Sequence, residues 1–162
     1  MQTLSKSFGL AGIRLGIAVG HPELIQILNN TKAPYNIGTP SALIAAEALS
    51  EEGLQKMYDY RQRLIDQRGL VIEKLKAISG IGRVLGGNDA NFVLVEILGS
   101  NGQPCNDRAH KVYSMMAEAL GVVIRFRGTE YGCNGCVRIT VGTEEENAKM
   151  LDMLEKALKD TA

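Results

Sequence analysis

The 162-residue sequence has no excess of charge of either sign, because 18 lysines and arginines balance 18 aspartates and glutamates. Proteins that bind nucleic acid or an anionic membrane surface normally carry a broad basic field. We therefore expect neither partner. Hydrophobic residues make up 45% of the chain, which is enough for one or two compact domains with a buried core.

Long hydrophobic runs are also missing. The longest apolar stretches, such as NFVLVEIL at 91–98, are too short to cross a bilayer. The N-terminus lacks the charged start and apolar run of a signal peptide. We therefore expect a cytoplasmic protein without a membrane span.

Cysteine is scarce. Cys105, Cys133 and Cys136 are an odd number of thiols, which suits a reducing compartment and no disulfide framework. The sequence CNGC at 133–136 forms a CxxC pair, but no second pair of cysteines or histidines at zinc spacing accompanies it. We interpret CNGC as a structural loop in preference to a metal or redox site.

Short apolar and amphipathic patterns alternate in the first half of the chain. LGIAVG at 15–20 indicates a buried strand, and HPELIQILNNTK at 21–32 predicts a helix with Pro22 in its first turn. APYNIGTP at 33–40 is typical of an irregular connection. Residues 40–79 are helical in pattern, with an interruption at SEEG, 50–53, and a long second part from Leu54.

The second half, from Gly80, begins with a glycine-rich lead into a strand. The pattern then predicts a helix that ends at Gly121, two strands joined by TEYGCNG, and a final helix. Thr143 and Glu146 have the spacing of a capping box at the start of that last helix. Strand, helix, strand, strand, helix indicates a small α/β sandwich.

One motif near the N-terminus carries chemistry: TLSKSFGLAGIRLG at 3–16. Its glycine spacing excludes both the GxGxxG fingerprint and a Walker loop. A lysine reacts with an aldehyde only as the neutral amine, which a neighbouring cation such as Arg14 favours at Lys6. Ser5 and Arg14 could hold the phosphate tail of an aldehyde cofactor. On spacing alone, a surface loop with a solvated Lys6 and Arg14 is the more common reading of such a pattern.

This motif resembles the lysine signature of fold-type I aminotransferases that depend on pyridoxal 5′-phosphate. Four later segments are similar to those of the histidinol-phosphate aminotransferases, most closely the fungal ones, and occur in the same order: KAPYNIGTP, GGNDANFVLV, GVVIRFRG and GCVRITVGTEEEN. The resemblance implies an α/β fold that is the C-terminal portion of a fold-type I transferase. Residues 1–45 would be a remnant of the large parallel-sheet domain that binds the cofactor, 46–79 a long linking helix, and 80–162 the small α/β sandwich domain.

The resemblance also assigns roles to individual residues. Lys6 is the Schiff-base lysine, and Ser5 and Arg14 are ligands of the cofactor phosphate. Arg138 grips the anionic end of the substrate, and Arg125 is associated with the phosphate of histidinol phosphate. The alternative is that Arg125 and Arg138 are simply two exposed arginines on strands. Asn91 and Tyr35 occupy family positions near the site, although an amide that starts a strand or a tyrosine in a loop is as often structural.

The implied activity is transamination of histidinol phosphate and imidazole-acetol phosphate with glutamate and 2-oxoglutarate in histidine biosynthesis, by a cytoplasmic homodimer. Three alternatives stay open within the sequence: an aromatic-amino-acid aminotransferase, an amino-acid-phosphate decarboxylase of the same fold, and a non-catalytic module.

Members of this family are longer, and the resemblance begins only at the lysine segment. The aspartate that pairs with the pyridinium nitrogen, the ring stacked on the cofactor and the glycine-rich phosphate turn would precede it. We therefore expect the isolated chain to be inactive, because without that aspartate the cofactor ring is a poor electron sink.

Overall fold

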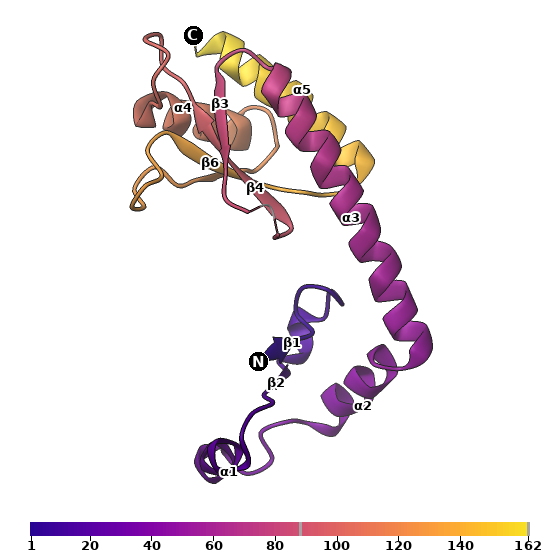
Figure 1. Cartoon of the computed structure of the whole chain (residues 1–162). Coiled ribbons are helices and arrows are strands. Elements are labelled where there is room, and N and C mark those ends of the chain that lie inside the picture. The colour runs from indigo at the N-terminus through magenta and orange to yellow at the C-terminus, as the bar shows by residue number, and fades with distance from the viewer. Residues whose placement is uncertain (88, 162) are drawn as a thin grey trace. The chain divides into compact units, whose positions relative to one another are not determined.

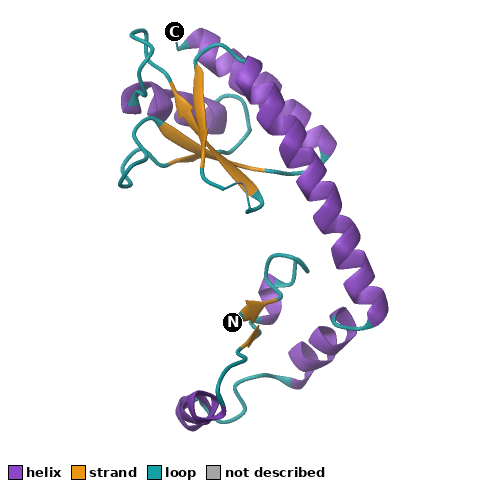
Figure 2. Cartoon of the chain, in the orientation of Figure 1, coloured by secondary structure: helices purple, strands orange, loops and turns teal. Residues whose placement is uncertain are grey.

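The computed structural model describes residues 1–87 and 89–161, which fall into two units, Met1–Gln62 and Arg63–Ala162. Figures 1 and 2 show the elements. The first unit contains β1 (Gln2–Thr3), the 3₁₀ turn η1 (Ala11–Ile13), β2 (Gly16–Ile17), α1 (Pro22–Thr31), α2 (Thr39–Ala48) and the start of α3 (Glu51–Ala77). The second contains the rest of α3, then β3 (Ile81–Leu85), β4 (Phe92–Ile97), α4 (Asn106–Glu118), β5 (Arg125–Phe126), β6 (Cys136–Thr140) and α5 (Glu144–Asp160).

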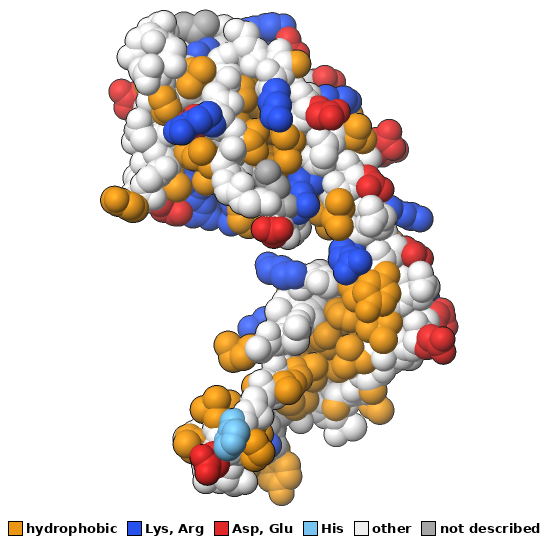
Figure 3. Space-filling view, viewed as in Figure 1, with side chains coloured by type: hydrophobic (Ala, Val, Ile, Leu, Met, Phe, Trp, Pro, Cys, Tyr) orange, Lys and Arg blue, Asp and Glu red, His pale blue; other side chains and the backbone are white. Residues whose placement is uncertain are grey.

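The first unit has almost no core. Among its described residues only Leu4 and Ala45 are buried. Large hydrophobic side chains stand exposed on α1, α2 and the start of α3: Leu24, Ile27, Leu28, Leu43, Ile44, Tyr58 and Tyr60. Figure 3 shows hydrophobic side chains gathered on the visible surface of this unit. The helices therefore display apolar faces that the described part of this unit does not cover.

The strand expected at 15–20 is shorter than predicted and is not buried. β2 covers only Gly16 and Ile17 and pairs antiparallel with β1, in a sheet that has two strands among the described residues. Val19, expected inside, is 85% exposed. The helix at 21–32 is confirmed, with Pro22 as its first residue, where a missing N–H leaves no hydrogen bond unmade.

The long helical region divides as predicted. α2 ends at Ala48 and α3 begins at Glu51, where the Ser50 hydroxyl accepts a hydrogen bond from the Gly53 N–H at 3.2 Å. This cap starts α3 three residues before the expected position at Leu54. None of the helices in the described residues is long and apolar enough to cross a membrane.

The second unit is built on a four-stranded antiparallel sheet in the order β3-β4-β6-β5. Sequence analysis missed β3 and read its residues as a lead into β4. Gly82 and a register shift between Ile81 and Val84 interrupt the alternation that marks a strand. The later order of helix, two strands and helix is confirmed.

One face of this sheet forms the core. Alternate residues of β4 and β6 pack with the end of α3 and with α4 and α5, including Val95, Val137, Leu75, Met116 and Leu154, all of which are fully buried. The capping box of α5 is present. Glu146 N–H donates to the Thr143 hydroxyl at 3.3 Å, and Thr143 N–H donates to the Glu146 carboxylate at 2.8 Å.

Candidate functional site

The lysine segment is a loop closed at its base by β1 and β2. Thr3 pairs with Gly16. Ser5 follows Thr3 by two residues and Arg14 precedes Gly16 by two residues, so both belong to the loop side of this antiparallel pair. Backbone turns begin at Leu4, Lys6 and Ala11 within this segment. Leu10 N–H donates a hydrogen bond to Leu4 O, and Gly9 N–H donates one to Lys6 O, both at 3.0 Å. Lys6 is exposed on this loop.

The two polar side chains that flank Lys6 are oriented within the segment. The Thr3 hydroxyl lies 2.9 Å from the Ser5 hydroxyl, and the Arg14 Nη1 donates to Ala11 O at 2.9 Å. The loop thus carries an amine, a hydroxyl and a guanidinium on one closed segment. This donor set fits a phosphate-bearing aldehyde.

Two residues to which the family resemblance assigns a role have a strained backbone. Arg14 (φ 52°) and Tyr35 (φ 54°) are the non-glycine residues with positive φ in the described part of the chain. A side chain in this left-handed region costs free energy, and such residues concentrate at functional sites. Tyr35 is fully exposed in the connection between α1 and α2.

Arg125 and Arg138 face each other across neighbouring strands. They are directly paired in the β5–β6 register. Residues paired in this way share a face of the sheet, and Arg138 also pairs with Leu94 of β4. The core residues Val95 and Val137 have the opposite parity. The two arginines therefore lie on the face away from the core, which we call the outer face and define by Leu94, Glu96, Arg125, Cys136 and Arg138.

The Arg138 side chain is held but incompletely bonded. Its guanidinium carbon lies 5.2 Å from the centroid of the Phe92 ring, within the range of a cation–π contact. Among the described residues, its Nε is one of two buried side-chain nitrogens without a hydrogen-bond partner, the other being that of Arg108. Like charges on directly paired residues of neighbouring strands repel, and Arg125 and Arg138 are such a pair. An anion between them would remove the repulsion and satisfy the free donor.

A third arginine on the outer face is neutralised. Glu96 is 5% exposed and accepts hydrogen bonds from the Arg83 N–H at 3.0 Å, Nε at 3.1 Å and Nη2 at 2.7 Å. The side-chain hydrogen bonds from Arg83 lower the pKa of Glu96, although burial acts to raise it. This carboxylate is thereby committed to Arg83.

Sequence analysis missed Asn106, the residue that fixes the loop between the two arginine strands. Its Nδ2 donates to Gly128 O at 3.1 Å, and its Oδ1 accepts from Gly135 N–H at 2.6 Å. The loop is thus held at both ends by the first residue of α4. No local signal distinguishes Asn106 from an ordinary helix-start asparagine.

The remaining positions are Asn91 and the three cysteines. Asn91 is exposed just before β4, and its carbonyl accepts from Val141 N–H at 2.9 Å. Cys105, Cys133 and Cys136 are free thiols. Over residues 1–87 and 89–161, no group of histidine, cysteine, aspartate or glutamate side chains is arranged to hold a metal ion.

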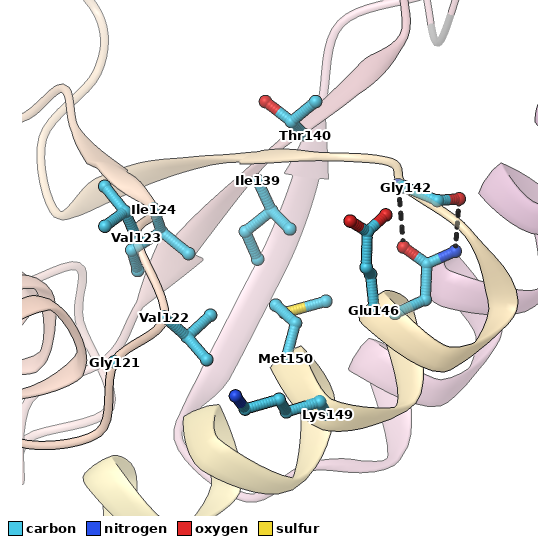
Figure 4. Close-up of a pocket in the computed structure, with 11 residues that line it drawn as sticks. Gly121, Val122, Val123, Ile124, Ile139, Thr140, Gly142, Glu146, Lys149 and Met150 are labelled. Atoms are coloured by element: carbon cyan, nitrogen blue, oxygen red, sulfur yellow. Dashed lines mark hydrogen bonds between the residues drawn. The ribbon is translucent and has the colours of Figure 1, made fainter.

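A pocket in the second unit is lined by residues of β6, α5 and the segment before β5. Figure 4 shows its wall of Val122, Ile124, Ile139 and Met150, between β6, the segment before β5 and α5. Two of its polar side chains are already engaged. Glu146 belongs to the capping box, and Asn147 bonds to the Gly142 N–H and carbonyl at 2.9 and 3.0 Å. These two side chains are therefore committed to the start of α5, and the arginine pair, with its unsatisfied buried nitrogen, is the better candidate site.

Comparison with known proteins places this geometry in a family. The sequence model of the aminotransferase class I and II family matches residues 1–154, and the chain belongs to this family. The chain is similar to the histidinol-phosphate aminotransferases of Schizosaccharomyces pombe (47% identity) and Saccharomyces cerevisiae (43%), with 98% of this chain covered in each case. It spans 42% and 40% of the length of these relatives.

A solved structure agrees with the fold. The crystal structure of histidinol-phosphate aminotransferase from Sinorhizobium meliloti in complex with pyridoxal-5'-phosphate superimposes with a TM-score of 0.83 at 21% identity, over 99% of this chain and 40% of that one. The family resemblance and the α/β fold class predicted from the sequence are confirmed. The division at residues 45 and 79 and the roles of the site residues stay predictions.

Proposed function

We propose that this chain is the C-terminal part of a pyridoxal 5′-phosphate-dependent aminotransferase that moves an amino group between histidinol phosphate and 2-oxoglutarate in histidine biosynthesis. Family membership and the fungal relatives support this proposal. The same resemblance supports a cytoplasmic homodimer. The observation that carries the choice of substrate is the opposed Arg125 and Arg138 pair with its unsatisfied buried Nε.

A pair of guanidinium groups suits a substrate with many anionic oxygens. Each guanidinium can form a bidentate pair with a carboxylate or a phosphate. A phosphate ester offers enough oxygens to pair with both guanidinium groups, whereas one carboxylate of glutamate can pair with only one of them. In this proposal Arg138 binds both substrates, and Arg125 adds affinity for the phosphorylated one.

The lysine segment would hold the cofactor. The Ser5 hydroxyl and the Arg14 guanidinium, at the same end of the closed loop, would bind the phosphate, and the Lys6 Nζ would bond to the aldehyde carbon. The cofactor, when bound, supplies an electron sink for the carbon that carries the amino group. Asn91 and Tyr35 are proposed to lie near the substrate, where the strained backbone of Tyr35 fits a role beyond packing.

The proposal is tested by alanine substitutions in the full-length enzyme. Arg138→Ala is expected to weaken the binding of both glutamate and histidinol phosphate by about tenfold to a hundredfold. This is the contribution of one or two charge-assisted hydrogen bonds. Arg125→Ala should penalise histidinol phosphate more than glutamate. Arg138→Lys should not restore activity, because an ammonium cannot reproduce the planar fork.

Arg127→Ala is the matched control for the arginine pair. Arg127 follows β5 in the same hairpin, but its Nη1 pairs with Glu130 at 2.8 Å. Its removal should leave the preference between the two substrates unchanged. Equal losses on both substrates from Arg125→Ala would contradict the division of roles, and a preference for aromatic amino acids or the release of carbon dioxide would contradict the proposed reaction.

Two further measurements address the cofactor. Borohydride reduction of the full-length enzyme, followed by peptide mapping, should place the pyridoxyl group on Lys6, and labelling of another lysine would contradict the assignment. The isolated 162-residue chain should not transaminate, because none of its residues is assigned to keep the cofactor ring nitrogen protonated. Conversion of glutamate by the isolated chain above the rate of free lysine plus cofactor would show this expectation to be wrong.

A further inference from the structure

We propose that Cys133 and Cys136 are a redox-modification site that forms a reversible disulfide within the loop between β5 and β6. Their CxxC spacing alone favoured a structural loop. The structure adds a backbone turn that brings the two thiols together. The inference does not depend on the proposed aminotransferase activity.

The backbone between the two cysteines is already folded for a cross-link. Cys136 N–H donates to Cys133 O at 2.9 Å, which closes a four-residue turn. The ends of such a turn lie less than about 7 Å apart, and disulfides span Cα separations of about 4.4–6.8 Å. The two thiols also influence each other, since Cys133 is among the causes that raise the pKa of Cys136.

Gly135 keeps this turn in one conformation. Its φ is +68°, a value that residues with a Cβ rarely adopt. A Cβ at this position would lie 2.6 Å from the Cys105 N atom. The Gly135 N–H also donates to Asn106 Oδ1. The cross-link can therefore form on a turn that is held independently of the thiols.

The two thiols differ in access, which sets the order of reaction. Cys133 is half-buried, whereas Cys136 is fully buried. Burial is the main cause that raises the pKa of Cys136 to about 11. A small disulfide in solution therefore reacts with Cys133 first. Cys136 remains a protonated thiol until Cys133 carries a mixed disulfide that the Cys136 sulfur can attack.

The reaction balances as thiol–disulfide exchange with a small disulfide such as oxidised glutathione. The Cys133 thiolate attacks one sulfur of the small disulfide, forms a mixed disulfide and releases one thiol. The Cys136 sulfur then gives up its proton and attacks the Cys133 sulfur, which releases the second thiol. Two electrons pass from the protein dithiol to the small disulfide, and the two protons end on the released thiols.

Cys105 is the matched control. Its N–H donates to Ile97 O at 2.9 Å, and its side chain faces Gly99, where an added Cβ would lie 3.1 Å from the Cys105 Cβ. It therefore belongs to the same region without sharing the turn. Removing it should leave the disulfide intact.

The test equilibrates the 162-residue chain with mixtures of reduced and oxidised glutathione, traps free thiols with an alkylating agent and maps peptides by mass spectrometry. We expect wild type and Cys105→Ser to lose two hydrogen atoms and to yield a linked 133–136 peptide, reversed by dithiothreitol. Cys133→Ser should yield no linked peptide. Cys136→Ala should accumulate glutathione on Cys133. The test stays informative because Cys133 is half-buried and its reaction does not require the Cys136 thiol.

Three results would overturn the inference. They are a linkage that contains Cys105, a wild-type chain in which glutathione stays on Cys133 without resolution, and a chain that keeps all three thiols in fully oxidised glutathione. The folding of each variant is checked by its circular dichroism spectrum, so a change in linkage cannot be confused with unfolding.

Discussion

The two units of this chain differ in where their hydrophobic side chains lie. The second unit encloses a contiguous core that joins α3, β4, β6, α4 and α5. In the first unit α1 is as amphipathic as α4 and α5 and α2 is largely apolar, yet only Leu4 and Ala45 are buried there. Amphipathic helices need an apolar partner surface to contribute stability. The difference teaches that the second unit is able to fold on its own core, whereas the described residues of the first are not.

Amide hydrogen exchange should show the largest contrast. Amides of β4 and β6 are expected to open only with global unfolding of the second unit, which gives at least about a thousandfold slower exchange than in residues 2–20. The measurement is exchange monitored by NMR or mass spectrometry on a chain shown to be monomeric. Equally slow exchange in both regions would remove the distinction between the units.

A pair of leucine substitutions should show the next largest effect. Leu154→Ala removes a fully buried side chain from α5 and should cost about 2–5 kcal/mol of unfolding free energy. Leu28→Ala in α1 removes a side chain that is 44% exposed, and should change stability by about 0.5 kcal/mol or less. Urea titration followed by circular dichroism measures both. A large loss from Leu28→Ala would reveal a core in the first unit.

Asn106→Ala tests whether the loop clamp stabilises the second unit. The change leaves Gly128 O and Gly135 N–H without their partner, at a cost of about 1–3 kcal/mol. Asn101→Ala is the control, because that exposed side chain accepts only a local bond from Gln103 N–H at 3.0 Å. Thermal unfolding of the two variants should separate them. Identical midpoints would show that the clamp carries no stability.

The smallest expected effect concerns Glu96 in acid. Hydrogen bonds from Arg83 lower its pKa in the folded chain, so the folded state binds this proton more weakly than the unfolded state. The resulting stability is present above the ordinary glutamate pKa of about 4.3 and is lost as pH falls through the lower folded-state pKa. Glu96→Gln should cost about 1 kcal/mol or less at pH 7 and should weaken the acid dependence. Urea midpoints at pH 7 and below pH 4.5 measure this, and parallel pH curves for both proteins would contradict it.

Local patterns were sufficient for features whose physical cause is local. Pro22 at the start of α1, and Thr143 with Glu146 at the start of α5, lie where their residue types predict. β3 was missed because Gly82 breaks the strand pattern, although the position has a packing reason. A Cβ there would lie 2.7 Å from Leu98 and 3.0 Å from Glu96.

Features that depend on distant partners were not accessible in this way. Asn106 acts on Gly128 and Gly135, which lie 22 and 29 residues further along the chain. The family motifs identified Arg125 and Arg138, but only the strand register shows that they are directly opposite. The exposed strand at Gly16 was wrongly expected to be buried, because an apolar run shows a capacity for burial without showing what covers it.

The opposed arginines also make the folded second unit sensitive to ionic strength in an unusual direction. Most surface charge pairs attract, so salt weakens them. Arg125 and Arg138 carry like charges on paired residues of β5 and β6. The Glu96 carboxylate on the same face does not offset them, because it is already paired with Arg83. We therefore expect dissolved anions to favour the folded state at this face, and multivalent anions to favour it more than chloride at equal ionic strength. Phosphate in a buffer would then act as a weak ligand of this hairpin.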